Sequence, residues 1–87
     1  MRAKEQGLPA LIRDVRRQIA LSQEDLARQL NVSYATVNRW ENAHARPSKL
    51  AKSQLEAFCA RMVQRGRLAL PAELLEAAGL NLDEEQA

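Results

Sequence analysis

The 87-residue chain is long enough for one domain, and with one Phe, one Trp and one Tyr its core must be built mainly from aliphatic side chains. Cys59 is the single cysteine, which excludes a disulfide within the chain, and no run of about 20 apolar residues predicts a membrane-spanning helix. No signal peptide, metal-ligand set, nucleophile motif or phosphate-binding loop is evident, so we expect a cytoplasmic protein that is not an enzyme and holds no metal or cofactor.

The charge is distributed unevenly along the chain. All thirteen Lys and Arg residues lie in residues 1–67, whereas residues 68–87 carry five acidic residues and no basic one. A basic body suits a polyanion such as nucleic acid, and the acidic tail should stay away from that partner or screen it. Ordinary solvated surface charge is the alternative that composition leaves open.

Helix-forming residues dominate the chain, and the spacing of the apolar ones predicts five helices. A polar arm over residues 1–7 precedes the first helix. Serines in N-cap positions mark helix starts, while Asn31, Gly66 and Gly79 mark helix ends. The expected fold is all-α, a compact bundle of about five helices. The predicted helices span residues 9–20, 23–30, 34–42 and 48–64, followed by a short one that starts at Pro71.

The helices over 23–30 and 34–42, joined by a three-residue turn, form the unit that indicates a function. Helices that cross steeply need a small residue where they touch, which Ala27 supplies. Their turn needs a residue that tolerates a positive φ, which Asn31 supplies. The inward positions are apolar, and the outward positions of the second helix are free to meet base edges. The inward residues are Leu26, Leu30, Val32, Val37 and Trp40; the outward ones are Ser33, Tyr34, Ala35, Thr36, Asn38 and Arg39.

The stretch from Leu21 to Ser48, LSQEDLARQLNVSYATVNRWENAHARPS, resembles the phage-repressor and Cro-type (XRE-like) helix-turn-helix family. The likeness covers about residues 8–62 and implies a lambda-repressor-like fold around a central helix-turn-helix. Ala43 departs from the family, which commonly has Gly after Glu-Asn. A left-handed alanine there would cost about 1 kcal/mol, unless the loop follows a different path. The matching positions are Ser22-Gln23, Leu26-Ala27, Val32-Ser33, Thr36-Val37, Trp40-Glu41-Asn42 and Pro47-Ser48.

The resemblance also implies which residues contact double-stranded DNA. The chemistry of the outward residues agrees, because Arg pairs with guanine, Asn pairs with adenine, and Ala can touch a thymine methyl. The ring of Tyr34 is expected to pack inward, with its hydroxyl on a phosphate. The family's base-reading positions correspond to Tyr34, Ala35, Asn38 and Arg39, and its phosphate-binding positions to Gln23, Ser33, Thr36, Asn42, Arg46 and Lys49.

Several residues near the motif have structural interpretations. We expect Glu41 to make a hydrogen bond or an ion pair that sets the helix ends, and Trp40 and Cys59 to belong to the core. For Arg16 and Arg17, long-range attraction of DNA and a plain solvated face both remain open.

Residues 66–87 are expected to form a C-terminal segment, a short helix and an acidic tail, beyond a DNA-binding domain over residues 8–65. Residues 66–80 are also similar to one strand and one helix of the looped-hinge DNA-binding fold, but a short amphipathic helix is the simpler interpretation. The leucines of this segment are too many for an exposed tail, so they must pack on the domain, on a second copy or on another protein. We favour dimerisation.

The sequence therefore predicts a nucleoid-associated transcription regulator, a homodimeric repressor that occludes inverted half-sites one helical turn apart, roughly 34 Å. Two alternatives stay open. An antitoxin would repress its own operon and bind a toxin through the C-terminal segment. A DNA-targeting subunit of a restriction or defence system would depend on a partner for catalysis. The sequence gives neither the operator nor an effector ligand.

Overall fold

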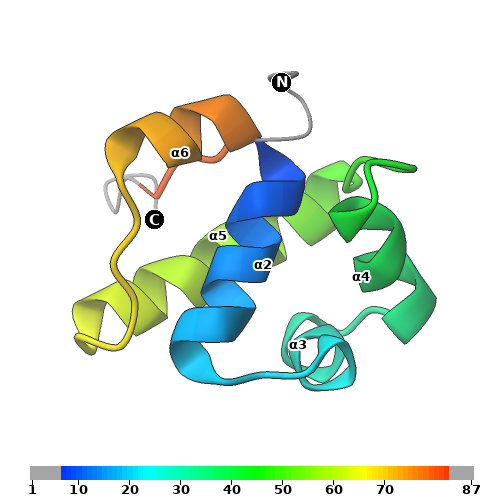
Figure 1. Ribbon diagram of the computed structural model, residues 1–87, viewed down its shortest axis with the longest axis horizontal. Coiled ribbons are helices and arrows are strands. Elements are labelled where there is room, and N and C mark those ends of the chain that lie inside the picture. The colour runs from blue at the N-terminus through cyan, green and yellow to red at the C-terminus, as the bar shows by residue number, and fades with distance from the viewer. Residues whose placement is uncertain (1–6, 83–87) are drawn as a thin grey trace.

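The computed structural model describes residues 7–82, which form five helices and no strand. The all-α prediction is confirmed, and the predicted helices lie within about one residue of the observed ones. None of these helices is both long and apolar enough to cross a membrane. Most of the predicted N-terminal arm and the end of the acidic tail lie outside the described residues. The helices are α2 (Leu8–Ile19), α3 (Gln23–Leu30), α4 (Tyr34–Glu41), α5 (Lys49–Gln64) and α6 (Ala72–Ala78) (Figure 1).

Three serines determine where α3, α4 and α5 begin. The Oγ of Ser22 accepts a hydrogen bond from the backbone N–H of Asp25 at 2.9 Å, and the Asp25 carboxylate accepts one from the backbone N–H of Ser22 at 3.1 Å. This reciprocal pair satisfies two donors that a helix start leaves without intrahelical partners. Ser33 and Ser48 cap α4 and α5, and the Oγ of each accepts one hydrogen bond, from the backbone N–H of Thr36 and of Ala51.

Left-handed residues other than glycine end two helices and continue the chain after a third. Asn31 has φ 62° at the end of α3, as its sequence position predicts. Ala43 has φ 60°, so the chain adopts the strained alanine rather than a different loop path. Ala20 also has φ 62°, at the end of α2, which the sequence analysis missed because alanine carries no signal for this conformation.

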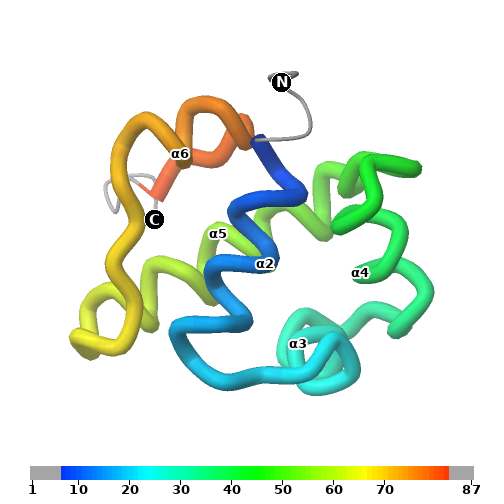
Figure 2. Tube along the Cα trace, viewed as in Figure 1, coloured from blue at the N-terminus to red at the C-terminus, as the bar shows by residue number. Residues whose placement is uncertain are grey.

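One apolar cluster occupies the centre of the fold. Figure 2 shows α2 crossing in front of α5, with α6 on one side and α3 and α4 on the other. Trp40 and Cys59 are 1% and 0% exposed, which confirms both as core residues. Burial raises the pKa of the Cys59 thiol to about 12. The cluster comprises Leu11, Ile12, Val15, Leu26, Ala27, Leu30, Val37, Trp40, Ala51, Leu55, Phe58, Cys59, Met62, Leu68 and Leu80.

The leucines of the C-terminal segment pack on the chain's own core. Leu68 and Leu80, on either side of α6, are 4% and 7% exposed and belong to the central cluster. Leu74 and Leu75 of α6 are partly buried against the same cluster, and α6 lies along α2. The sequence left open whether these leucines pack on the domain, on a second copy or on another protein, and in the structure they pack on the domain. The connection from Gly66 to α6 contains no strand, so the likeness to a looped-hinge fold is not reflected in the structure.

Candidate nucleic-acid interface

The inner face of α4 is fixed by apolar and polar contacts together. Val37 and Trp40 point into the core and are 0% and 1% exposed. Ser33 caps the start of the helix, because its Oγ accepts from the backbone N–H of Thr36 at 3.1 Å. Glu41 at the end of α4 is 4% exposed and is the one buried charged residue within residues 7–82. A carboxylate can be buried at this depth only if its oxygens find donors.

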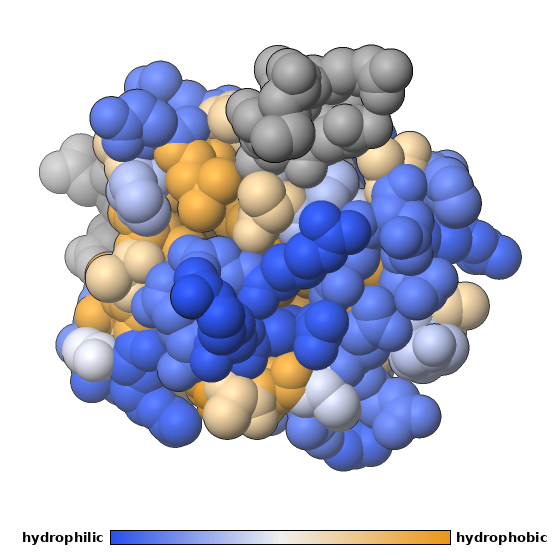
Figure 3. All heavy atoms as spheres, in the orientation of Figure 1, coloured by the Kyte–Doolittle hydropathy of each residue, from blue (hydrophilic) through white to orange (hydrophobic). Residues whose placement is uncertain are grey.

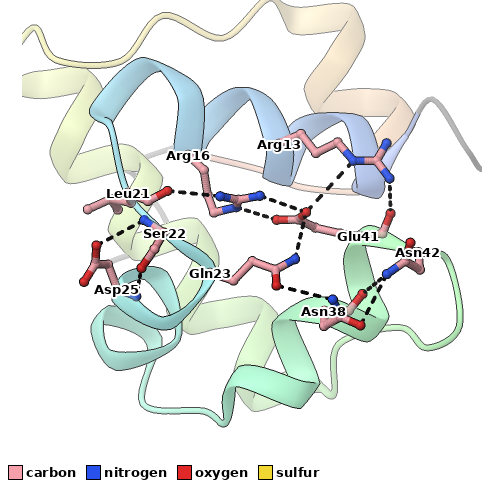
Figure 4. A network of polar contacts seen from close by, with 9 residues as sticks. All are labelled: Arg13, Arg16, Leu21, Ser22, Gln23, Asp25, Asn38, Glu41 and Asn42. Carbon is pink, nitrogen blue, oxygen red and sulfur yellow. Dashed lines mark hydrogen bonds and ion pairs between the residues drawn. The ribbon is translucent and has the colours of Figure 1, made fainter.

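Two other helices supply those donors (Figure 4). From α2, Arg16 donates Nε–H to Oε2 of Glu41 at 2.6 Å and Nη2–H to Oε1 at 3.1 Å. From α3, Gln23 donates Nε2–H to Oε1 at 3.0 Å. Arg13 donates to the backbone carbonyl of Glu41 at 2.7 Å, and its Nε lies 4.0 Å from the carboxylate. We refer to Arg13, Arg16, Gln23, Asn38 and Glu41 as the Glu41 network; it ties α4 to both α2 and α3.

The electrostatics of this pair favour the charged forms of both partners. Burial raises the pKa of Glu41, but the hydrogen bonds from Arg16 and Gln23 and the nearby positive charges outweigh it and hold the pKa below its usual value. The hydrogen bond to Glu41 in turn raises the pKa of Arg16. Every buried side-chain nitrogen and oxygen in the described part of the chain has a partner. The prediction that Glu41 makes an ion pair is confirmed.

Gln23 and Asn38 continue the network towards the outer face of α4. Asn38 donates Nδ2–H to Oε1 of Gln23 at 3.3 Å, and Asn42 donates to the backbone carbonyl and to Oδ1 of Asn38, at 2.8 and 3.3 Å. An amide group has two N–H donors and an oxygen with two lone pairs. Gln23 therefore keeps one N–H available, and Asn38 keeps one N–H and one lone pair.

The remaining outward residues of α4 differ in exposure. Ala35 and Arg39 are exposed, and no residue within 7–82 forms a hydrogen bond or ion pair with the side chain of Arg39. Tyr34 is 51% exposed, so the prediction that its ring packs inward is wrong. The physical reason is its surroundings, because Tyr34 borders a shallow hollow whose other lining residues, Arg16, Ser22, Gln23 and Glu24, are all polar or charged.

Besides Gln23 and Asn42, the predicted phosphate-binding residues form two groups. Ser33 and Thr36 lie together at the start of α4, where their hydroxyl oxygens are 2.8 Å apart and share a hydrogen bond. Arg46 and Lys49 are exposed, one in the loop after α4 and the other at the start of α5. The first group lies at the N-terminal end of α4 and the second follows its C-terminal end in the chain.

The structure separates the arginines of α2. Arg16 does not simply lie on a solvated face, because its guanidinium donates to the carboxylate of Glu41 and to the backbone carbonyl of Leu21 at 3.1 Å. Arg17 is exposed and pairs with Asp14 one turn earlier. The sequence analysis did not single out Arg13, although it lies off the apolar stripe of α2 as Arg16 does. Figure 3 shows strongly hydrophilic side chains across the middle of the face formed by α2.

Comparison with known proteins agrees with this geometry. Residues 12–51, from the second turn of α2 to the start of α5, match the family model described as helix-turn-helix. No curated protein and no solved structure matches the chain. The matched segment contains the Glu41 network, all of α3 and α4, and the loop that carries Arg46.

Proposed function

Since residues 12–51 belong to the XRE-type helix-turn-helix family of DNA-binding transcription regulators, we propose that this protein is a sequence-specific repressor that acts as a homodimer. Helix α4 enters the major groove and reads base edges, while the residues that flank it hold phosphates. Bound protein then occludes the operator. This proposal extends from the family to particular residues, to repression and to the dimeric state.

The exposed guanidinium of Arg39 on α4 is the observation on which the proposal rests. Its guanidinium is exposed on α4 and has no partner among residues 7–82, while the opposite side of the helix is fixed by Val37 and Trp40. A rigid helix with a free guanidinium on its outer face suits bidentate pairing with O6 and N7 of guanine. Each such pair contributes about 1–3 kcal/mol of discrimination against a wrong base.

Asn38 supports the same mode of reading. Its contacts with Gln23 and Asn42 fix the orientation of its amide and leave one N–H and one lone pair. Adenine in the major groove presents one acceptor, N7, and one donor, the N6 amino group, so the remaining capacity of Asn38 is complementary to it. The exposed methyl of Ala35 lies three residues before Asn38 on the same helix, where it can contact a thymine methyl.

The phosphate contacts follow from what each residue has left to donate. Gln23 is the first residue of α3, so a phosphate that accepts its second N–H also meets the N-terminal end of that helix. Arg46 and Lys49 provide positive charge on the other side of α4. Because one recognition helix covers only a few base pairs, two copies on inverted half-sites supply the length of site that specificity requires.

Selection from random DNA duplexes over a series of salt concentrations tests the proposal. We expect an inverted repeat to be enriched and to persist at physiological salt, because base contacts do not depend on counterion release as phosphate contacts do. Binding that fades with salt and enriches no sequence would show phosphate contact alone. An enriched single half-site would retain sequence reading but contradict the dimer.

Arg39→Ala then tests the residue assignment. We expect a loss of about 1–3 kcal/mol on the selected site and relaxed preference at one base pair. The matched control is Arg65→Ala, which removes an exposed arginine just beyond the far end of α5 and should leave the base preference unchanged. An equal loss on all sequences for Arg39→Ala would mean that Arg39 holds phosphate and does not read a base.

A further inference from the structure

A hollow of about 550 Å³ lies behind the loop that follows α4. Five parts of the chain line it: the start of α2, Trp40 of α4, the loop over residues 43–47, the first turn of α5 and the C-terminal end of α6 with the residues after it. Figure 1 shows the end of α6 beside the start of α2, which brings these segments together. The volume is within the range of small-molecule sites, about 300–1,000 Å³.

The inner wall of this hollow is apolar. Pro9, Trp40 and Leu80 line it and are themselves buried, so their surfaces form its deep side. Leu8 and Pro47 line it as well and are half-buried. An apolar surface that is concave and assembled from distant segments binds the hydrocarbon part of a ligand by removing it from water.

The rim of the hollow carries charge. Arg46 and Lys52 contribute two positive charges and Glu76 contributes one negative charge, and all three side chains are exposed. Within residues 7–82 no ion pair joins Glu76 to either cation. The rim therefore has a net positive charge, and its cations are available to a ligand.

We propose that this hollow binds a small organic carboxylate whose hydrocarbon body lies against Leu8 and Pro47, above the buried Trp40 and Leu80, and whose carboxylate meets Arg46 and Lys52 at the rim. An apolar body alone would not distinguish one hydrocarbon from another, so the two cations select the acid over the alcohol or the amine of the same shape. Glu76 restricts the ligand to a single negative charge, because a second one would face its carboxylate.

Such a ligand would lower the affinity for DNA, a consequence that rests on the proposed function. Arg46 belongs both to the rim of the hollow and to the predicted phosphate contacts. A carboxylate that engages its guanidinium competes with a DNA phosphate for the same group. Binding of the ligand to the free protein does not depend on DNA, so the two parts of the inference can be tested separately.

The first test uses the fluorescence of Trp40, which is the single tryptophan of the chain and lines the hollow. The full-length protein is titrated with 4-phenylbutyrate, and in parallel with 4-phenylbutanol and 4-phenylbutylamine, which have the same hydrocarbon body. We expect a saturable change of emission with the acid and at least about threefold weaker binding of the alcohol and the amine, the size of effect that exposed charge contacts give. Equal affinity for all three compounds, or no saturable change, would overturn the proposal.

Variants then locate the site. Ala77→Phe on α6 fills the hollow and should abolish the response to the acid, whereas Ala72→Phe on the same helix lies outside the hollow and should preserve it. Lys52→Gln should weaken binding of the acid and Glu76→Gln should strengthen it, each by about threefold. Circular dichroism confirms that each variant is folded. An unchanged response in Ala77→Phe, or the same direction of change in the two rim variants, would contradict the proposed site.

The second test measures DNA binding with and without 4-phenylbutyrate at fixed ionic strength. We expect the acid to weaken binding of wild-type protein and to have no effect on Ala77→Phe. If the acid binds the free protein but the protein binds no DNA, the hollow remains a carboxylate site and the proposed function fails. If DNA binding is specific but insensitive to bound acid, the coupling through Arg46 is wrong.

Discussion

Replacing Glu41 by Gln should lower the free energy of unfolding by about 3 kcal/mol, because the carboxylate accepts three hydrogen bonds from Arg16 and Gln23 and is almost fully buried. The amide of Gln has one acceptor oxygen, so at least one of these donors would face an N–H₂ group. Removing one partner of a buried ion pair costs about 3–5 kcal/mol. The lower end applies because the side chain of Arg16 is 25% exposed, so water can reach its guanidinium.

This loss is large for a chain of this size. Domains have about 0.05–0.15 kcal/mol of stability per residue, and one kcal/mol shifts the melting temperature of a domain of 60–100 residues by about 4–8 °C. We therefore expect Glu41→Gln to melt about 12–24 °C below the wild type. Urea unfolding at pH 7, followed by the fluorescence of Trp40 and by circular dichroism, gives the free energy directly.

Glu24→Gln is the matched control. Glu24 is exposed in the first turn of α3, so its loss should cost less than about 1 kcal/mol, the scale of a helix-dipole contact. If Glu41→Gln costs no more than Glu24→Gln, the Glu41 network contributes nothing and apolar packing alone holds α4. The double variant with Arg16→Gln should cost about as much as Glu41→Gln alone, since the second change removes the charge that the first leaves unpaired.

Three further predictions concern acid, backbone strain and thiol reactivity. The pKa of Glu41 in the folded protein is below its ordinary value of 4.5. The stability that Glu41 contributes is therefore present above that pH and is lost as the pH falls through the folded pKa. Urea unfolding between pH 7 and pH 3 should show this loss, and Glu41→Gln should be less sensitive to acid. Ala43→Gly should relieve the strain of the left-handed backbone, which raises the free energy of unfolding by up to about 1 kcal/mol and the melting temperature with it. Ala57→Gly, inside α5, should lower the free energy of unfolding by about 0.5–1 kcal/mol. If both substitutions change the free energy of unfolding in the same direction, Ala43 is not strained. Iodoacetamide should label Cys59 slowly in native protein and rapidly in urea, because burial raises its pKa to about 12; fast native labelling would refute its burial.

The helices could be predicted from the sequence because their signals are local. The hydroxyls of Ser22, Ser33 and Ser48 each accept a hydrogen bond from the backbone N–H three residues later, so the signal for a helix start is local. The spacing of apolar residues is recognisable within one or two helical turns. Trp40 was predicted to be core for the same reason, since it lies three residues beyond Val37 on one face of α4. The left-handed conformation of Ala20 could not be predicted, because the path of the chain from α2 into α3 requires it and the alanine side chain does not favour it.

The Glu41 network could not be predicted in detail because its members are distant in sequence. Glu41 and Arg16 are separated by 25 residues, and spacing on α2 shows only that Arg16 lies off the apolar stripe. Whether α4 covers that side of α2, and so brings Glu41 to Arg16, depends on how the helices pack and not on the local sequence. The prediction that the ring of Tyr34 packs inward was wrong for a related reason. The spacing of three residues between Tyr34 and Val37 predicts that they share a face of α4, but not whether the core extends to the start of that helix.

The leucines around α6 show a different limit. Their number required burial, and the sequence could not choose among the domain, a second copy and another protein. The structure buries Leu68 and Leu80 in the core, so these side chains are not available for a dimer. The dimer that we propose must therefore use another surface, which the spacing of half-sites in the selected DNA will constrain.

If Asn38 reads a base as proposed, the Glu41 network links the stability of the fold to base reading. The carboxylate of Glu41 takes one N–H of Gln23, and this fixes the Gln23 oxygen where Asn38 can donate to it. The single amide oxygen of Glu41→Gln cannot accept all three hydrogen bonds that Arg16 and Gln23 donate to the carboxylate, so Gln23 competes with Arg16 for its acceptor. The Gln23 amide is then held less firmly as the partner of Asn38, although nothing on the outer face of α4 has changed. Discrimination at the base pair that Asn38 reads should therefore weaken in Glu41→Gln, while discrimination by Arg39, which has no link to the network, should persist. A variant that weakens both base pairs equally would indicate displacement of the whole helix, and one that weakens neither would show that Asn38 needs no orientation from within the protein.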